Sequence, residues 1–348
     1  MPQKQALNLL LLAKNKRLSE NRLAHYAPYE KQIAFHLAGL LFAERLFSAG
    51  NQLGKTWAGA YEMAMHLTGR YPDWWQGRRF AYPIRAMAGS ESAELTTKGV
   101  QRLLIGPPEI ETEWGTGAIP KATFIRTSKK SGVPNALDSA SIKHISGGVS
   151  VLKFNSYDQG RTKWQADTVD VVWFDEEPDI DLYMEGITRT NATRGIVFVT
   201  FTPLKGMSAT VDRFYPVPKY ACCHVTTMTI HDVGHYTQEE KDAIIAKYPA
   251  HERDARTKGI PMLGSGRIFA LPDEAILVEP FALPDLWPRI RGTDFGWDHP
   301  SAHVWLAWDR DNDIVYVVAC LRMVESTPAE LSAGRKCARC VGAGRVAA

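Results

Sequence analysis

The sequence predicts an α/β protein with a mostly parallel sheet, followed by a shorter region of antiparallel strands. Through most of the chain, short apolar runs alternate with polar or glycine-rich turns and helical segments, which is typical of parallel sheets with crossover helices. Near the C-terminal end, consecutive strands follow one another without helices. The 348 residues leave room for two domains. With 45% hydrophobic and 23% charged residues, the chain is not a disordered or disulfide-stapled polypeptide.

Apolar runs between turn signals predict the strands of the first region. They are Arg45–Ala49, Phe80–Ala88, Gly148–Phe154, Val169–Phe174 and Ile196–Thr200. The periodicity of Thr56–Leu67 predicts a helix directly after the first strand, and Gln238–Arg256 is a further helical stretch. The glycines and proline that follow indicate a linker.

Three further strands are predicted beyond the linker, over Ile290–Phe295, Ala302–Trp308 and Ile314–Cys320. The polar turn 310–313 joins the last two as a hairpin. A change from crossover helices to a hairpin indicates that a new domain begins here.

Charge, cysteines and apolar runs restrict the class of protein. The net charge of +3 is compatible with nucleic-acid binding but does not argue for it. Five cysteines, an odd and sparse set, favour a reducing compartment over a disulfide framework. No apolar run approaches the roughly 18 residues of a membrane span. Ala6–Ala13 is interrupted by Asn8 and followed by basic residues, so it predicts an amphipathic helix rather than a signal peptide.

A glycine-rich turn between the first strand and its helix has the spacing of a phosphate-binding loop. The pattern requires Gly, four residues, Gly-Lys and Ser or Thr; here Ala49 holds the first position, with Gly50 beside it. Backbone N–H groups of such a turn and the helix N-terminus attract phosphate. Lys55 would reach the β- and γ-phosphates and Thr56 would bind Mg²⁺, unless this is an ordinary glycine turn. The predicted nucleotide-binding residues of this loop are Gly50, Asn51, Gln52, Leu53, Gly54, Lys55 and Thr56.

Two carboxylates follow the most apolar strand. Val169–Phe174 is nearly continuous in its hydrophobicity, as expected of a strand buried on both faces, and it ends in Asp175 and Glu176. Asp175 could hold Mg²⁺ and Glu176 could polarise the attacking water. The alternative is a strand that simply ends in surface acids. Because 120 residues separate Asp175 from Lys55, there is room for the acidic strand to lie next to the loop strand.

Two weaker signals complete the predicted nucleotide site. Thr200 and Thr202 end the next strand, where a hydroxyl beside the loop could sense the γ-phosphate. Gln32, 23 residues before Lys55, has an amide that could donate to and accept from adenine. A lone glutamine on a helix surface is the simpler interpretation of Gln32.

As a set, these motifs resemble the large terminase subunit of tailed bacteriophages. The matching segments, in order, are Pro28 with Gln32, Gly50–Thr56, Val171–Glu177, Thr200–Pro203 and Arg291–Asp298. The resemblance implies an ATPase that drives double-stranded DNA into a capsid. It also implies a P-loop ATPase domain of the additional-strand, RecA-like type, followed by an RNase H-like nuclease domain that cuts concatemeric DNA.

The resemblance divides the chain into five segments. They are an N-terminal helical segment (1–24), the ATPase domain (25–255), a linker (256–270), a partial nuclease domain (271–330) and an atypical, disordered tail (331–348).

The family's roles carry over to matching positions. Lys55 and Glu176 would be catalytic, Thr56 and Asp175 would hold Mg²⁺, and Thr200 and Thr202 would couple hydrolysis to movement. Asp294 would be the first catalytic, metal-binding carboxylate of the nuclease. The implied cofactors are ATP, Mg²⁺ and a divalent metal at the nuclease site. The implied partners are double-stranded DNA, the small terminase subunit, the capsid portal protein and further copies of this chain, in the bacterial host cytoplasm and without a membrane.

Two features depart from the family's pattern. Many members carry an arginine finger inside the loop, where this chain has Asn51 and Gln52, so Arg161, Arg189 or a neighbouring subunit would supply it. After Asp313 the only acids are Glu325 and Glu330, and we expect an incomplete, metal-poor nuclease and a truncated or frame-shifted tail.

Other interpretations of the sequence stay open. The Cys337–Cys340 pair is expected to be accidental, because a single CxxC without further ligands is weak evidence for zinc. The alternatives for function are a helicase-like DNA-dependent ATPase and a non-functional prophage remnant.

Overall fold

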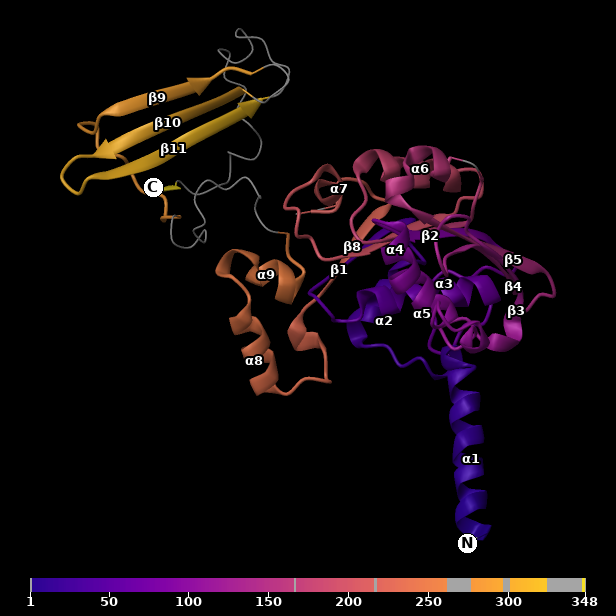
Figure 1. The fold of residues 1–348 in the computed structure, drawn as a ribbon. Coiled ribbons are helices and arrows are strands. Elements are labelled where there is room, and N and C mark those ends of the chain that lie inside the picture. Colours follow the sequence, from indigo (N-terminus) through magenta and orange to yellow (C-terminus); the bar gives the residue numbers. More distant parts are fainter. Residues whose placement is uncertain are drawn as a thin grey trace. The chain divides into compact units, whose positions relative to one another are not determined.

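The computed structural model describes residues 2–165, 167–215, 218–261, 277–296, 301–323 and 346–347. The chain forms two compact units, Met1–Arg267 and Ile268–Ala348 (Figure 1). The predicted Asp298, Glu325, Glu330 and Cys337–Cys340 lie outside the described residues.

An eight-stranded sheet organises the first unit, in the order β3-β4-β5-β2-β6-β7-β1-β8. The six strands from β5 to β8 in this order are parallel, and β3 and β4 add an antiparallel hairpin at one edge. This confirms the predicted α/β fold. The strands are β1 (Glu44–Ala49), β2 (Arg85–Ser90), β3 (Phe124–Lys129), β4 (Leu137–Lys143), β5 (Val149–Ser156), β6 (Val171–Asp175), β7 (Ile196–Phe201) and β8 (Cys223–Met228).

Helices cover the sheet or lie at its ends. The α-helices of this unit are α1 (Pro2–Ser19), α2 (Glu30–Ala38), α3 (Lys55–Thr68), α4 (Ala93–Leu95), α5 (Arg102–Ile105), α6 (Ile180–Thr190), α7 (Ala209–Asp212), α8 (Gln238–Lys247) and α9 (Ala250–Lys258). A π-helical segment, Thr96–Gln101, joins α4 to α5. Short 3₁₀ turns are Arg22–His25, Glu111–Glu113, Lys121–Thr123, Tyr157–Gln159, Arg161–Trp164 and Ile230–Asp232.

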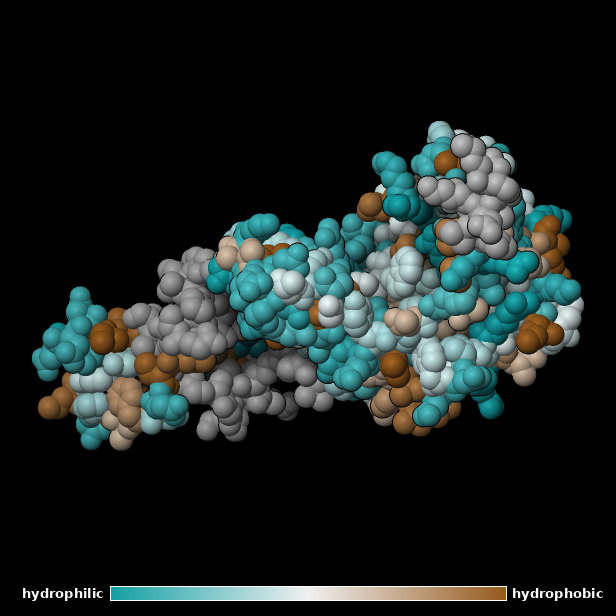
Figure 2. All heavy atoms as spheres, turned by 90° about the horizontal axis from the view of Figure 1, so that it is seen from below, coloured by the Kyte–Doolittle hydropathy of each residue, from teal (hydrophilic) through white to brown (hydrophobic). Residues whose placement is uncertain are grey.

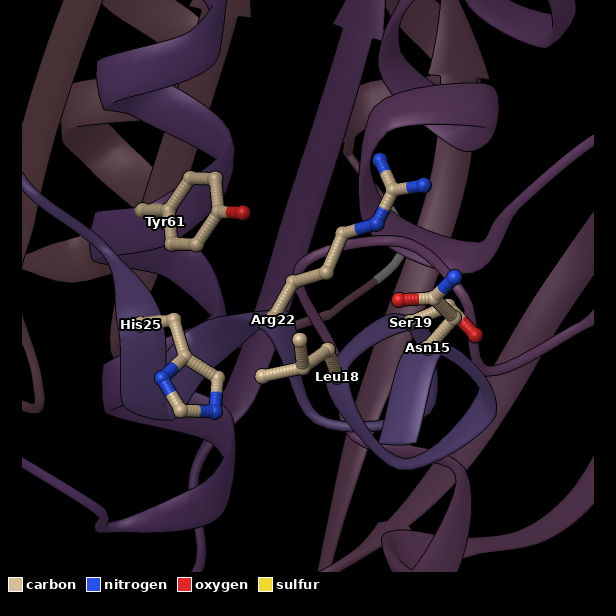
Figure 3. A pocket seen from close by; sticks show the side chains of 6 residues that line it. All are labelled: Asn15, Leu18, Ser19, Arg22, His25 and Tyr61. Atoms are coloured by element: carbon tan, nitrogen blue, oxygen red, sulfur yellow. The ribbon is translucent and has the colours of Figure 1, made fainter. Parts of the chain in front are cut away.

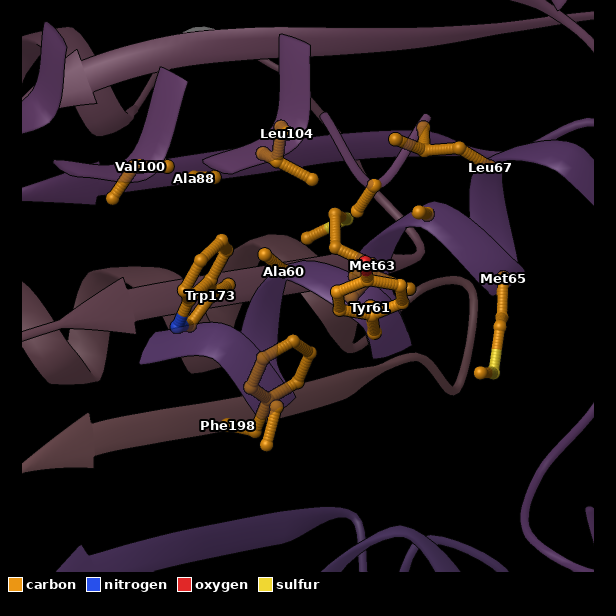
Figure 4. Packing of buried hydrophobic residues seen from close by; sticks show 14 of the residues in the cluster. Ala60, Tyr61, Met63, Met65, Leu67, Ala88, Val100, Leu104, Trp173 and Phe198 are labelled. Atoms are coloured by element: carbon orange, nitrogen blue, oxygen red, sulfur yellow. The ribbon is translucent and has the colours of Figure 1, made fainter. Parts of the chain in front are cut away.

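The core has one layer on each side of the sheet. On one side α3 lies over β6 and β7, and Trp173 and Phe198 pack beneath it (Figure 4). Gly59 of α3 permits this packing, because a Cβ there would lie 2.6 Å from the Trp173 ring. On the other side α6 and α7 cover a second cluster that includes Phe174 and Phe201. Strands buried on both faces explain the nearly continuous apolar runs in the sequence.

One predicted neighbour relation is wrong. The strand that carries Asp175, β6, does not lie beside the loop strand β1, because β7 is inserted between them: it pairs with β6 on one side and with β1 on the other. The crossover through α6 returns the chain one strand nearer to β1. Strand β2 also begins later than predicted, at Arg85 rather than Phe80. Pro83, which has no N–H to donate, precedes it, and Phe80 is buried in the core instead.

The second unit is an antiparallel sheet in the order β12-β11-β10-β9. Its strands are β9 (Arg289–Asp294), β10 (Ser301–Asp309), β11 (Ile314–Met323) and β12 (Val346–Ala347). The first three confirm the predicted strands. Asp309 stabilises the predicted hairpin turn, because its carboxylate accepts N–H bonds from Asp311 and Asn312 at 3.1 and 3.3 Å.

The surface offers no membrane-crossing element in the part of the chain that the structure describes, where no helix is both long and apolar enough. The predicted N-terminal helix is present as α1, but it is not amphipathic as predicted, because the spacing of its apolar residues does not gather them along one side of the helix. Leu11 and Leu12 are exposed at its surface. Seen from below, the face in view is mainly hydrophilic with small hydrophobic groups (Figure 2).

A fully buried ionic cluster joins α2, β1 and α3. The carboxylate of Glu62 pairs with Arg45, accepts a bond from His36 at 2.7 Å and lies 3.3 Å from His66. Burial alone would raise the pKa of Glu62, but the Arg45 charge and the two histidine hydrogen bonds hold it well below its usual range. The cluster therefore keeps Glu62 ionised in an apolar interior.

Removing this carboxylate should destabilise the protein strongly. We expect Glu62→Ala to lower the free energy of unfolding by about 3–5 kcal/mol, because Arg45 would be left buried without a counter-charge. Urea denaturation measures the change. Glu94→Ala, which removes an ion pair with Lys98 at the surface, is the control and should barely move the midpoint. Equal midpoints for the two variants would contradict this role of Glu62.

Candidate nucleotide-binding site

The loop between β1 and α3 lies at the carboxyl edge of the parallel strands. Gly54 immediately precedes α3 with a φ of +87°, a left-handed conformation that favours glycine. At Gly50 a Cβ would lie 2.5 Å from the carbonyl oxygen of Arg256, and the N–H of Asn51 donates to that oxygen at 2.8 Å. The loop thus requires its glycine at position 50, and Ala49 ends the strand.

Gln32 is not a surface residue. Its side chain is 2% exposed, its Oε1 accepts the N–H of Tyr29 at 2.9 Å, and its Nε2 donates to the carbonyl of Gly54 at 3.0 Å. The interpretation as a surface glutamine is therefore wrong. Gln32 braces the phosphate loop from α2, and Lys55, the first residue of α3, is buried beside it.

The predicted metal ligands and one of the coupling threonines meet in a chain of hydrogen bonds. The Trp173 indole N–H donates to the Thr200 hydroxyl at 2.8 Å, and Thr200 donates in turn to the Asp175 carboxylate at 2.8 Å. An indole N–H can only donate, so the Thr200 proton must point to Asp175. The hydroxyl of Thr56 acts on the same carboxylate, since it lowers the pKa of Asp175. Residues that are far apart in sequence are thereby placed in direct contact.

Asp175 has an unusual acidity. Burial and the nearby Glu176 charge raise its pKa to about 7, while hydrogen bonds from Thr200 and Thr56 and the charge of Lys55 act in the opposite direction. A buried carboxylate beside a hydroxyl is a donor set of hard oxygens that suits Mg²⁺. The residues present therefore fit the implied ion, whose charge would keep Asp175 ionised.

Glu176 is held in a strained conformation. Its φ of +70° lies in the left-handed region, which non-glycine residues rarely adopt outside special sites. Its N–H donates to the Thr200 carbonyl at 2.9 Å, and the Tyr157 hydroxyl lies 2.8 Å from its carbonyl oxygen and 3.0 Å from that of Asp175. Burial raises the pKa of Glu176, against the charge of Lys55. These contacts hold the backbone of Glu176 in place directly after β6.

The second threonine contacts the loop from the other side. The Thr202 hydroxyl donates to the carbonyl of Ala49 at 2.8 Å. Thr200 and Thr202 thus connect the two halves of the site through one segment that continues β7. This arrangement is possible because β7, and not β6, is the neighbour of β1.

The two candidate arginine fingers do not contact the loop in this structure. Arg161 and Arg189 both pair with Glu185 of α6, at 2.9 and 3.0 Å. The carbonyl of Arg189 accepts the N–H of Val169, before the start of β6 and thus far from its carboxyl end. Besides Lys55, a second cation acts on Glu176: Lys205, whose Nζ bonds Glu91 at 3.1 Å.

Two residues of this site, Lys205 and Tyr157, are not predicted from the motifs, although their positions near strand ends are visible in the sequence. Lys205 lies two residues after the Thr200–Pro203 motif, so a cation close to a strand end is visible in the sequence. Tyr157 begins a 3₁₀ turn directly after β5, at a strand end on the same edge. The role of Trp173 has no signal, because an aromatic residue in an apolar strand is ordinary.

A cavity of about 210 Å³ opens beside the phosphate loop. It is lined by Asn51, Gln52, Leu53, Ile230, Tyr236, Ile244, Lys247, Tyr248 and Arg256. Its walls combine aliphatic and aromatic side chains with two cations. A wider hollow of about 450 Å³ between the end of α1 and Tyr61 involves none of the predicted site residues (Figure 3).

Asp294 is the last residue of β9 and pairs across the sheet with Ala302. Among the described residues it does not belong to any group of three metal-ligating side chains. The group that does form, Glu44 with Cys222 and Cys223, lies at the amino ends of β1 and β8. There Arg213 binds both oxygens of Glu44, at 2.7 and 2.9 Å, which satisfies the carboxylate without a metal.

The sheet order and the loop define the first unit as a P-loop ATPase fold with β7 between the loop strand and the acidic strand. Comparisons with known proteins agree. Residues 46–276 match the family described as terminase large subunit, T4likevirus-type, N-terminal. The terminase large subunit of Salmonella phage P22 is 45% identical over 340 residues, covering 93% of this chain and 68% of that one. That of Enterobacteria phage LP7 is 40% identical over 244 residues, covering 69% and 50%.

The chain therefore belongs to the terminase large subunit family, and it is an ATPase of DNA packaging. Its fold is similar to that of a large terminase from a thermophilic bacteriophage, with a TM-score of 0.52 at 11% identity, covering 88% of this chain and 73% of that one. This coverage exceeds the first unit alone, so the similarity extends into the second. The α/β fold expected from the sequence agrees with this similarity.

The acidity of Asp175 predicts a pH-dependent stability without metal. Since its pKa is raised from 3.8 to about 7, the folded state keeps the proton longer than the unfolded state. The stabilisation that comes from protonated Asp175 is fully present below the pKa that this carboxyl has in the unfolded chain. It is lost progressively as the pH rises to about 7. In EDTA, Asp175→Asn should gain stability over the parent between pH 4 and 7, reaching about 2–4 kcal/mol. Chemical denaturation across this range measures it, with the exposed Asp181→Asn as control. A gain independent of pH would contradict it.

Tyr157→Phe tests the support of Glu176. Two buried carbonyls would lose their donor, so we expect kcat to fall roughly tenfold with little change in KM. Steady-state ATP hydrolysis measures both constants. Tyr82→Phe is the matched control, because Tyr82 is exposed and its hydroxyl lies 3.5 Å from Asp170. An unchanged kcat in Tyr157→Phe would show that this hydroxyl does not position Glu176.

Proposed function

We propose that this chain hydrolyses ATP at the β1–α3 loop, with Lys55 on the phosphates, Mg²⁺ between Thr56 and Asp175, and Glu176 as the base. The observation that carries the proposal is the convergence of Thr56, Asp175 and Thr200 on one hydrogen-bonded centre beside Lys55. Nothing in such a site requires covalent catalysis, since phosphoryl transfer depends on positioning and charge neutralisation.

Each side chain has a definite task in this proposal. Lys55 neutralises charge that develops on the γ-phosphate, and the bound ion supplies further electrostatic stabilisation. Glu176 accepts a proton from the attacking water, and its raised pKa brings its basicity nearer to neutral pH. Thr200 then transmits the change at Asp175 along β7 to Thr202 and the loop.

The cavity beside the loop supports a position for the base of the nucleotide. Tyr236, Tyr248 and Ile244 offer apolar surface for a flat ring, and Asn51–Leu53 form the wall nearest to the phosphate positions. Gln32, predicted to bind adenine, has both amide atoms engaged with Tyr29 and Gly54. We assign Gln32 to the support of the loop, with the base held by the cavity.

The wider role follows from the family. The chain drives double-stranded DNA into a capsid as copies assembled on the portal protein, in the cytoplasm of the bacterial host, and a small terminase subunit selects the DNA. Asp294 is the first metal-binding carboxylate of a nuclease site that needs a divalent metal and further ligands. Its place at the end of an antiparallel strand supports this role. A neighbouring subunit or Lys205 supplies the cation expected of an arginine finger.

Substitution of the base tests the proposal directly. We expect Glu176→Gln to bind ATP with unchanged affinity but to lose turnover by at least about 100-fold, because the water loses its proton acceptor. Phosphate release and a fluorescent-nucleotide titration measure the two quantities. Lys55→Ala serves as the inactive blank, and Glu177→Gln as the matched neighbouring change that should retain most activity. Turnover of Glu176→Gln at the parent rate would remove this residue from the mechanism.

A further inference from the structure

The antiparallel edge of the sheet presents an open face. Cross-strand partners lie on the same face, so the pairing of Arg126 with Ser141, and of Ser141 with Val151, places these three in one row. The adjacent rows contain Ser128, Ser139 and Lys153, and Lys143 with Val149. Arg85 of β2 extends the first row. We call Arg85, Arg126, Lys143, Lys153 and the three serines the basic face.

No helix covers a core on this face, because the buried apolar side chains of these strands point the other way and Val149, on the basic face, is exposed. Ala140 and Ile142 alternate with the serines and are buried in the core formed with α3. On the side of the basic face, α6 contacts β6 and β7. Arg85, Arg126, Ser128 and Lys143 are all exposed. Within the described part of the chain, this face of β3–β5 is therefore open to a partner.

The charge of the chain is concentrated in this region. Residues 121–163 contain eight lysines and arginines but only two acids. The remainder of the chain has 33 basic and 36 acidic residues, so the whole positive excess comes from these 43 residues. Lys153 pairs with Asp167, but among the described residues no carboxylate forms an ion pair with Arg85, Arg126 or Lys143. These cations are available to an external anion.

We infer that the basic face binds the sugar–phosphate backbone of double-stranded DNA, an inference that rests on the proposed packaging function. Arginine, lysine and serine are side chains that make phosphate contacts, which hold a duplex without reading its sequence. A surface with hydroxyls between cations suits a polymer that must slide, because its phosphates can exchange one polar partner for the next. Such binding is driven by counterion release and weakens steeply with salt.

The position of the face connects DNA to hydrolysis. Strand β5 runs from Val149 on the basic face to Ser156, and Tyr157 follows directly with its hydroxyl on the carbonyls of Asp175 and Glu176. Strand β2 likewise leads from Arg85 to Ser90, next to Glu91, which pairs with Lys205. DNA bound across the strands would press on elements that end at the catalytic carboxylates. We therefore expect DNA on this face to stimulate ATP turnover.

The double variant Arg126→Gln/Lys143→Gln tests the inference. With a fluorescein-labelled duplex of about 30 base pairs, anisotropy titrations between about 50 and 200 mM salt give the affinity and its salt dependence. We expect about tenfold weaker binding and a slope of log K against log salt that is shallower by about two. Stimulation of ATP turnover by DNA should fall in parallel, while turnover without DNA stays at the parent value.

Lys14→Gln/Lys16→Gln is the matched control, because it removes the same charge from exposed positions of α1. Equal losses in both double variants would overturn the inference in favour of a general charge effect, and parent-like binding by Arg126→Gln/Lys143→Gln would also overturn it. ATP turnover without DNA is measured in parallel, with Lys55→Ala as the blank. This measurement tests the proposed hydrolysis independently of DNA binding. If that turnover is present and the variant binds like the parent, only the basic face is wrong.

Discussion

A single buried carboxylate fixes the elements from which the nucleotide site is built. Glu62 of α3 holds Arg45, at the start of the loop strand β1, and His36, near the end of α2. Each of these partners is inaccessible to water, so none can move without leaving a charge or a polar group unpaired. The strand and the helix on either side of the phosphate loop are therefore joined by a buried ion pair that is costly to separate. The position of α2 follows, and with it Gln32 and its bond to Gly54.

At the carboxyl edge of the sheet, hydrogen bonds rather than an ion pair hold a second buried carboxylate in place. Trp173 orients Thr200, and Thr200 orients Asp175, so the carboxylate is held even though its charge is unfavourable in an apolar interior. Burial disfavours the charged form of Asp175 and raises its pKa, so a bound cation would stabilise the ionised carboxylate. The glycine at position 59 belongs to the same constraint, because only the absence of its side chain lets the Trp173 ring pack against α3.

Much of this architecture is predictable from sequence, for one physical reason. Strands buried on both faces are recognisable as apolar runs, and the glycines and lysine of the loop have fixed spacing, so the predicted β1, β5, β6, β7 and α3 lie close to their observed bounds. The hairpin of β3 and β4 escapes prediction because one of its faces is open and polar, which removes the apolar signal. The predicted strand order is wrong because pairing depends on contacts between residues far apart. The surface interpretation of Gln32 fails because its burial comes from the loop, not from its own helix.

The loop is also held from its C-terminal side, and this bears on how hydrolysis can be transmitted. The carbonyl of Arg256 accepts the N–H of Asn51, and the carbonyl of Gly259 accepts the hydroxyl of Ser48 at 2.5 Å. Gly259 adopts a φ of +65° close to the backbone of Ala49, so a larger residue would displace the loop. A change at the phosphates that shifts this loop must therefore move the end of α9 or break these bonds. Arg256 of α9 also lines the cavity beside the loop. With the base in this cavity, as we propose, the base and the phosphates would act on the same helix, through which the nucleotide state can reach the chain that follows it.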